Sequence, residues 1–150
     1  MAARFRGFLP VVVDLETGGF DPQKHAILEA AAVHLQFDRE QLVLGEEWHQ
    51  AVEPYPGSSI EEAALKVTGI DPEDPDRGAL PERIALKELF AGIRRAMKRE
   101  RCQRAILVAH NAAFDQQFLN IAIERQQIKR SPFHPFSFID TASLAAVAYG

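Results

Sequence analysis

The sequence VVVDLETGGF, residues 11–20, places two carboxylates one residue apart at the end of an apolar run. Side chains of a β-strand point alternately to its two faces, so Asp14 and Glu16 are predicted to share one face. Two like charges on one face repel each other unless a cation lies between them. The glycine pair that follows permits a tight turn. The stretch therefore predicts a first strand over about 9–15 that ends in an acidic site.

A second acidic motif, AHNAAFD at residues 109–115, follows a short apolar run that predicts a buried strand over 105–109. Asp115 falls in the first turn of the next helix, and sites in open α/β sheets commonly lie just beyond the end of a strand. If the two strands are neighbours, Asp115 meets Asp14 and Glu16 in a cluster of carboxylates. An isolated acid pair is usually solvated, and an isolated Asp at a helix start usually interacts with the helix dipole. The combination instead favours a metal site.

The chemistry of such a cluster indicates which metal it would bind. Carboxylate oxygens suit Mg²⁺ or Mn²⁺, and a bound ion relieves the repulsion between the acids. Two ions about 3.5–4 Å apart would activate a water molecule and stabilise the leaving oxygen of a phosphodiester. The sequence therefore predicts a hydrolytic site with two Mg²⁺ ions, or Mn²⁺ in their place.

The remaining pattern predicts one α/β domain over residues 1–150, with a mixed β-sheet flanked by helices. Residues 26–37 fit a helix by their alanines and a strand by the alternation of VHLQF. Ser59 begins a capping-box pattern for a short helix that stops near Gly69. The next helix has an apolar stripe of Ile84, Leu86, Leu89, Phe90, Ile93 and Met97. The other expected elements are a strand over 45–53, a hairpin across 38–44, a loop over 71–78, helices over 81–99, 113–126 and 140–149, and a rigid Pro-rich connector over 131–136.

The composition is ordinary for a soluble globular protein, with 150 residues, a net charge of −4 and one cysteine, Cys102. A single cysteine excludes an internal disulfide and fits a reducing cytoplasm. No apolar run approaches the roughly 20 residues of a membrane span. Acids concentrate between Asp14 and Glu88, whereas basic side chains gather over 94–104, at 129–130 and at the N-terminus. This separation predicts an acidic site and a distinct basic patch.

The two acidic motifs together resemble the DEDD superfamily of 3′-to-5′ exonucleases, which have a ribonuclease H-like fold. Four blocks resemble the exoribonuclease branch of that superfamily in order and spacing: RFRGFLPVVVDLETGGF, GIDPEDPDRGA, CQRAILVAHNAAFD and IKRSPFHPFSFIDTA. The similarity extends from about Arg4 to Gly150. It implies a Mg²⁺-dependent homodimer that trims the 3′ ends of transfer RNA and other stable RNAs, with Asp14, Glu16 and Asp115 as its metal-binding catalytic acids.

The resemblance also implies contacts with the substrate. Phe20, Phe114 and Phe136 match phenylalanines that stack on terminal bases, an interaction worth about 1–3 kcal/mol per base. Phe133 and Phe138 are instead expected in the core. Five basic residues match the phosphate-gripping positions of the family, namely Arg4, Arg6, Lys98, Arg104 and Lys129. In the family dimer this patch serves the active site of the other subunit, and such binding weakens steeply with salt.

The sequence departs from the family pattern in two places. Ala63 and Val67 stand where the family has a substrate-contacting Glu and Phe, so the 3′-base preference is expected to differ. The family's general-base His and its last metal-binding Asp, five residues later, lie beyond the position of Gly150. His134 and Asp140 fall inside a matched block and are not substitutes, and Asp140 is expected to cap a helix or support the site. The chain as given is therefore expected to have little or no activity, and to expose apolar surface where a covering helix is missing.

Two other functions compete with this interpretation. A non-catalytic RNA-binding or dimerisation module would keep the basic patch and the aromatic residues without turnover. A DNA-proofreading exonuclease or an oligoribonuclease would share the acidic motifs, but the basic residues and the IKRSPFHPF block disfavour it.

Overall fold

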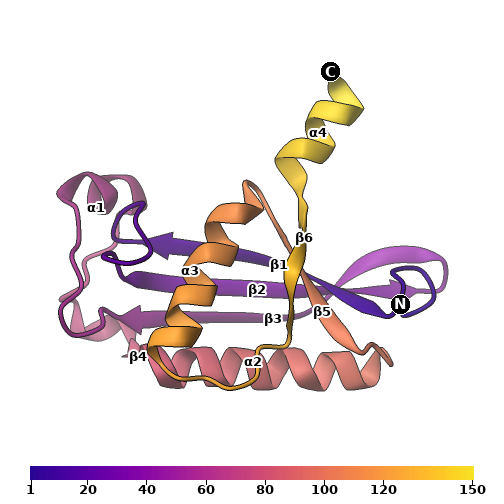
Figure 1. Cartoon of the computed structure of the whole chain (residues 1–150), viewed down its shortest axis with the longest axis horizontal. Coiled ribbons are helices and arrows are strands. Elements are labelled where there is room, and N and C mark those ends of the chain that lie inside the picture. Colours follow the sequence, from indigo (N-terminus) through magenta and orange to yellow (C-terminus); the bar gives the residue numbers. More distant parts are fainter.

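The computed structural model describes residues 1–150, which form a six-stranded mixed β-sheet with helices packed on it (Figure 1). The strands are β1 (Phe8–Thr17), β2 (Ile27–Asp38), β3 (Gln41–Glu53), β4 (Leu80–Pro81), β5 (Arg104–Ala109) and β6 (Phe133–Asp140). Their spatial order is β4-β3-β2-β1-β5-β6. Strand β2 is antiparallel to β1 and β3, whereas the pairs β1–β5, β5–β6 and β3–β4 are parallel. The predicted α/β class with a mixed sheet is confirmed.

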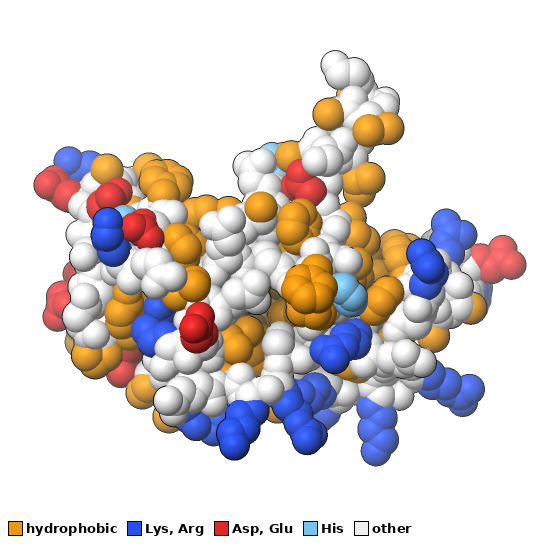
Figure 2. All heavy atoms as spheres, viewed as in Figure 1, with side chains coloured by type: hydrophobic (Ala, Val, Ile, Leu, Met, Phe, Trp, Pro, Cys, Tyr) orange, Lys and Arg blue, Asp and Glu red, His pale blue; other side chains and the backbone are white.

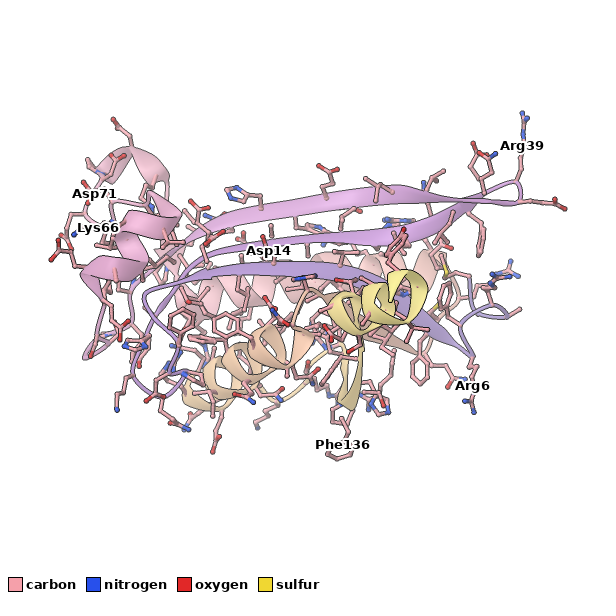
Figure 3. The ribbon with its side chains drawn as sticks, turned by 90° about the horizontal axis from the view of Figure 1, so that it is seen from above. Arg6, Asp14, Arg39, Lys66, Asp71 and Phe136 are labelled. Atoms are coloured by element: carbon pink, nitrogen blue, oxygen red, sulfur yellow. The ribbon has the colours of Figure 1, made fainter.

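The helices are α1 (Glu62–Thr68), α2 (Glu82–Arg99), α3 (Ala112–Arg125) and α4 (Thr141–Tyr149), with a 3₁₀ turn, η1, at Pro75–Arg77. Helices α2 and α3 supply the helical side of the hydrophobic core and lie on one side of the sheet (Figures 1 and 3). Helix α4 extends from the end of β6 away from the sheet, and its large apolar side chains, Leu144, Val147 and Tyr149, are exposed (Figure 1). None of the helices has the combination of length and apolar character that crossing a membrane requires.

The residues that fit both helix and strand form strand β2, because their backbone finds partners on both sides, in β1 and β3. Ala30 and Ala32 face the core, where small side chains leave room for α2. On the neighbouring strand, Trp48 lies against Gly92 of α2, where a Cβ atom would come within 2.2 Å of Trp48 Nε1. The close approach of sheet and helix therefore depends on small residues at these positions.

Two predictions about helices are wrong. Ser59 does not cap α1, because the helix begins at Glu62 and its N-cap residue, Glu61, makes no side-chain capping bond. The N–H of Glu61 instead donates to the carbonyl of Gly18 (2.7 Å), so contact with the turn after β1 sets the helix start. Ile84 is exposed and does not belong to the buried stripe of α2.

The expected connector and hairpin also differ from the structure. The Pro-rich segment forms part of edge strand β6, where the pairing with β5 is irregular between Ala105 and Leu107. An edge strand tolerates Pro135 because its outer side needs no partner. The hairpin between β2 and β3 is tighter than predicted, with Asp38 paired to Gln41.

Candidate active site

Asp14 and Glu16 lie on the same face of β1, as the alternation of the strand requires. Their neighbours Val13 and Leu15 are buried on the opposite face, whereas Asp14 is exposed and Glu16 is half-buried. Pairing between β1 and β2 places Glu16 directly opposite Glu29. Figure 3 shows Asp14 on β1, away from the ends of the molecule. The acid pair is therefore presented to solvent from a rigid strand.

Asp115 reaches β1 from the first turn of α3. Strand β5 pairs with β1 only as far as Val12, so backbone groups on this side of β1 beyond Val12 can form hydrogen bonds with side chains. The N–H of Leu15, between the two acids, donates to Oδ1 of Asp115 (3.1 Å). Asp115 is only 4% exposed. The fold thus brings the two acidic motifs together although they are 100 residues apart in the chain.

The three carboxylates repel one another. Burial, reinforced by the charges of Asp14 and Glu16, raises the pKa of Asp115 to about 6. Burial and the charges of Asp14 and Glu29 also raise the pKa of Glu16. None of the three carboxylates forms an ion pair with Lys, Arg or His. The cluster is therefore a centre of uncompensated negative charge.

A divalent cation would supply the missing positive charge. No group of three or more His, Cys, Asp or Glu side chains converges closely enough to enclose an ion by itself. Mg²⁺, however, usually keeps several water ligands and binds to proteins through one or two carboxylates. The donor type, the charge and the open side of the cluster consequently fit such an ion, with Asp14, Glu16 and Asp115 as the residues that would hold it.

Two of the three predicted stacking residues lie together beside the acids. The rings of Phe20 and Phe114 are 6.2 Å apart between centroids and inclined by 65°. Phe114 also packs on Phe118 in the core (4.8 Å), which holds its ring in place. Phe20 is 83% exposed and has room to accept a base. The pair forms an aromatic step next to Asp115.

The aromatic residues of β6 are distributed differently from the expectation. Phe136 is 86% exposed, and the ring of His134 lies 6.2 Å from its ring between centroids. In Figure 3 Phe136 points away from Asp14. Phe133 is buried, as predicted. Phe138 is 38% exposed and not in the core, because it lines a cavity of about 560 Å³ at the start of α3. Phe114 and Gln117 line the same cavity, which sequence reasoning missed because only the register of β6 reveals it.

The predicted basic residues gather at the far end of β1. Phe8 pairs with Arg104, and the Gln103 N–H donates to the Gly7 carbonyl, so the N-terminal arginines lie beside the segment after α2. Figure 2 shows Lys and Arg along the edge formed by α2, whereas the largest group of acids visible on this face lies toward α1. One cavity, of about 460 Å³, is lined by Arg94, Arg104, Lys129 and Arg130. Arg94 and Arg130 were not predicted as site residues, although their sequence positions within basic runs were a signal.

The other predicted positions lie on α1 and β6. Ala63 and Val67 are exposed on one face of α1. Asp140 caps α4 through the Ser143 N–H, so the expectation of a helix cap is confirmed. The Nδ1 atom of His134 accepts the Ser137 N–H (2.9 Å), a local role within β6.

Sequence comparison with known proteins identifies the family to which the chain is similar. The sequence profile described as "Exonuclease" matches residues 11–150. A protein named Ribonuclease T from Marinobacter nauticus is 54% identical over 151 residues, which cover 100% of this chain and 68% of that protein. Ribonuclease T from Hahella chejuensis is also 54% identical, over 69% of its length.

Solved structures share the fold. E. coli exonuclease I, in complex with a dT13 oligonucleotide, superposes with a TM-score of 0.73 over 95% of this chain at 17% identity. The metal-free complex of the same enzyme with single-stranded DNA gives a TM-score of 0.69 at 19% identity. This chain spans about 30% of the exonuclease I chain. The expected ribonuclease H-like fold is confirmed.

Proposed function

This chain belongs to the exonuclease family, and we propose that it acts as a divalent-metal-dependent 3′-to-5′ exoribonuclease of the ribonuclease T type. Exonucleases of this family generally depend on divalent metal ions. The observation that carries the proposal is the cluster of Asp14, Glu16 and Asp115. Burial and neighbouring acids raise the pKa values of Glu16 and Asp115, and none of the three carboxylates has a cationic partner. A protein stabilises such a cluster by binding a cation there.

Each acid has a defined task in this proposal. Two Mg²⁺ ions, when bound, would supply an activated water and stabilise the leaving oxygen of the phosphodiester. Asp14 and Glu16 hold metal from a strand whose pleat fixes their spacing. The Leu15 N–H orients the carboxylate of Asp115 and keeps it close to β1. Because partners of this kind orient metal ligands, the geometry of the site depends on the packing of α3 against β1.

The aromatic step positions the end of the RNA. Phe114 directly precedes Asp115, so a base stacked on its ring leaves the attached phosphate near the acids. Stacking on Phe20 and Phe114 is tolerant of sequence because every base has a flat face. The exposed ring of Phe136 serves a base farther from the reaction, since it lies on β6, two strands away from β1.

The predicted basic residues bind the phosphates of the RNA backbone at a distance from the acids. Arg4 and Arg6 lie before the start of β1, and Phe8 and Asp14 are six positions apart along that strand, which corresponds to roughly 20 Å. One terminal nucleotide does not span that distance. We therefore assign the patch of Arg4, Arg6, Lys98, Arg104 and Lys129 to the active site of a second subunit in a cytoplasmic homodimer, acting on the 3′ ends of transfer RNA and other stable RNAs.

A non-catalytic binding module is the weaker alternative. Such a module would need the basic patch and the aromatic rings, but it would gain nothing from three mutually repelling carboxylates. The family match also covers the acidic motifs and not only the basic residues.

Degradation of end-labelled RNA tests the proposal. The protein at its full encoded length is incubated with single-stranded RNA labelled at either end, in Mg²⁺ or in EDTA. We expect 5′-labelled RNA to shorten one nucleotide at a time in Mg²⁺, and we expect no shortening in EDTA or with Asp14→Asn. Binding of RNA without shortening would contradict the proposal. Release of internal fragments would show an endonuclease instead.

A further inference from the structure

The carboxylate of Asp140, at the end of β6, contacts the N-termini of two helices. Its Oδ1 atom accepts the backbone N–H groups of Asn111 (2.9 Å) and Ala112 (3.2 Å), at the start of α3. Its Oδ2 atom accepts the N–H (3.1 Å) and the hydroxyl (2.6 Å) of Ser143, in α4. These hydrogen bonds, that of the Ser143 hydroxyl first, lower the pKa of Asp140 to about 2. Each oxygen therefore serves a different helix.

Helix α3 depends on this cap because it has none of its own. A helix start leaves four N–H groups without partners inside the helix. The N-cap residue of α3, Asn111, adopts a left-handed conformation (φ 61°, ψ 52°), and its side chain makes no capping bond. The missing acceptor comes from Asp140, 29 residues later in the chain. The start of α3 is consequently fixed to strand β6 and not to its own preceding loop.

The capped turn contains Asp115, one of the three proposed metal ligands. Asp115 lies three residues after Ala112, within the first turn of α3, and its carboxylate accepts the Leu15 N–H of β1. The turn is thus held at two points, at its backbone by β6 and at its side chain by β1. If the backbone cap is lost, the first turn can fray, and Asp115 then shifts relative to Asp14.

We propose that Asp140 is a positioning residue of the active site, which fixes Asp115 for metal binding by capping α3 from β6. It acts through the first turn of α3 and contacts neither the metal nor the RNA. The inference rests on the proposed function of the Asp14, Glu16 and Asp115 cluster. The two oxygens of Asp140 allow its role toward α3 to be separated from its role toward α4.

Three variants make that separation in the protein at its full encoded length. Asp140→Ser keeps a good N-cap for α4, but its hydroxyl is one atom too short to reach the start of α3. Asp140→Asn keeps an Oδ1 acceptor for α3, while its amide can donate to the Ser143 hydroxyl. Ser143→Ala removes the hydroxyl contact with α4 and leaves both bonds to α3 intact.

Binding of Mn²⁺, followed by electron paramagnetic resonance of the free ion, is the primary measurement. It is made at a temperature at which circular dichroism shows every variant fully folded. We expect Asp140→Ser to weaken Mn²⁺ binding by about 10- to 100-fold, as loss of a group that orients a metal ligand does. At fixed Mg²⁺, kcat should fall with little change in KM for RNA. Amide exchange at residues 111–118 should accelerate. Asp140→Asn and Ser143→Ala should behave like the wild type in all three measurements.

Several results would overturn the inference. One is a folded Asp140→Ser variant that binds Mn²⁺ as the wild type does. Another is an equal loss in Ser143→Ala, which would place the effect in α4. A loss in Asp140→Asn as large as in Asp140→Ser would show that the charge matters and the cap does not. Failure of the wild type itself to bind Mn²⁺ or trim RNA would instead refute the proposed function.

Discussion

Replacing Asp115 with asparagine is expected to stabilise the metal-free protein above pH 6 and to remove its response to metal. Asparagine has the same shape and keeps an oxygen that can accept the Leu15 N–H, but it carries no charge. In the native state, burial and the charges of Asp14 and Glu16 raise the pKa of Asp115 from 3.8 to about 6. In the unfolded chain the carboxyl returns to its ordinary behaviour.

The sign and size of the effect follow from proton linkage. As the pH rises through the window from 3.8 to about 6, the unfolded chain releases the proton of Asp115 before the native protein does. The stability of the wild type therefore falls across that window. A pKa displacement of this size corresponds to about 3 kcal/mol. Asp115→Asn avoids the loss, so the variant should be more stable by up to about 3 kcal/mol at pH 8 and by less than about 1 kcal/mol at pH 4.

Urea unfolding followed by circular dichroism measures both parts of this prediction. The first series is run in EDTA at pH 4, 6 and 8, and the second in MgCl₂ at pH 8. Metal at 100 times its Kd stabilises a binding protein by about 2.7 kcal/mol, so the advantage of the variant should shrink or vanish in MgCl₂. Asp38→Asn, which changes an exposed carboxylate in the hairpin, is the matched control and should show neither effect. A difference between wild type and Asp115→Asn that does not depend on pH, or equal stabilisation of both by Mg²⁺, would refute the reasoning.

Three further predictions address the substrate surface and the core. Phe114→Ala should raise KM for single-stranded RNA by about 5- to 150-fold, because one stacking contact is worth about 1–3 kcal/mol, and an unchanged KM in steady-state kinetics would contradict its role. Gly92→Ala should lower the free energy of unfolding by about 1–3 kcal/mol in spite of alanine's better helix propensity, since overpacking opposes it. In Gly92→Ala the new Cβ would lie 2.2 Å from Trp48 Nε1. An unchanged urea midpoint would contradict this prediction, because it would show that α2 shifts without loss of stability. Arg104→Gln and Lys129→Gln should each reduce the slope of log K against log salt by about 1 in fluorescence anisotropy, whereas a phosphate-independent role would leave the slope unchanged.

The sequence predicted the elements whose local pattern agrees with their final environment. Strand β1 was evident because its alternation matches one buried and one open face. The sequence could not show whether the residues of β2 form a helix or a strand, because alanine favours helix locally. Pairing with β1 and β3 overrides that preference. The capping pattern at Ser59 failed for a related reason. Backbone contact with Gly18 decides where α1 starts, and no local signal reports that contact.

The sequence also selected the candidate acids, but not the contacts that bring them together. Spacing within two short motifs selected Asp14, Glu16 and Asp115 as candidates, because a divalent metal ion favours carboxylate ligands. The bond between Asp115 and Leu15 depends on where β5 stops pairing with β1, which only the register shows. The role of Asp140 likewise depends on the three-dimensional meeting of β6 with the start of α3.

Titration of the protein with Mn²⁺, monitored by electron paramagnetic resonance, tests the central claim that the acids of β1 and α3 bind a divalent ion. We expect saturable uptake by the wild type and by Asp38→Asn. Uptake should be lost in Asp14→Asn and in Asp115→Asn, although both variants remain folded. Equal uptake by all four proteins would contradict the account, because it would place the metal elsewhere on the molecule.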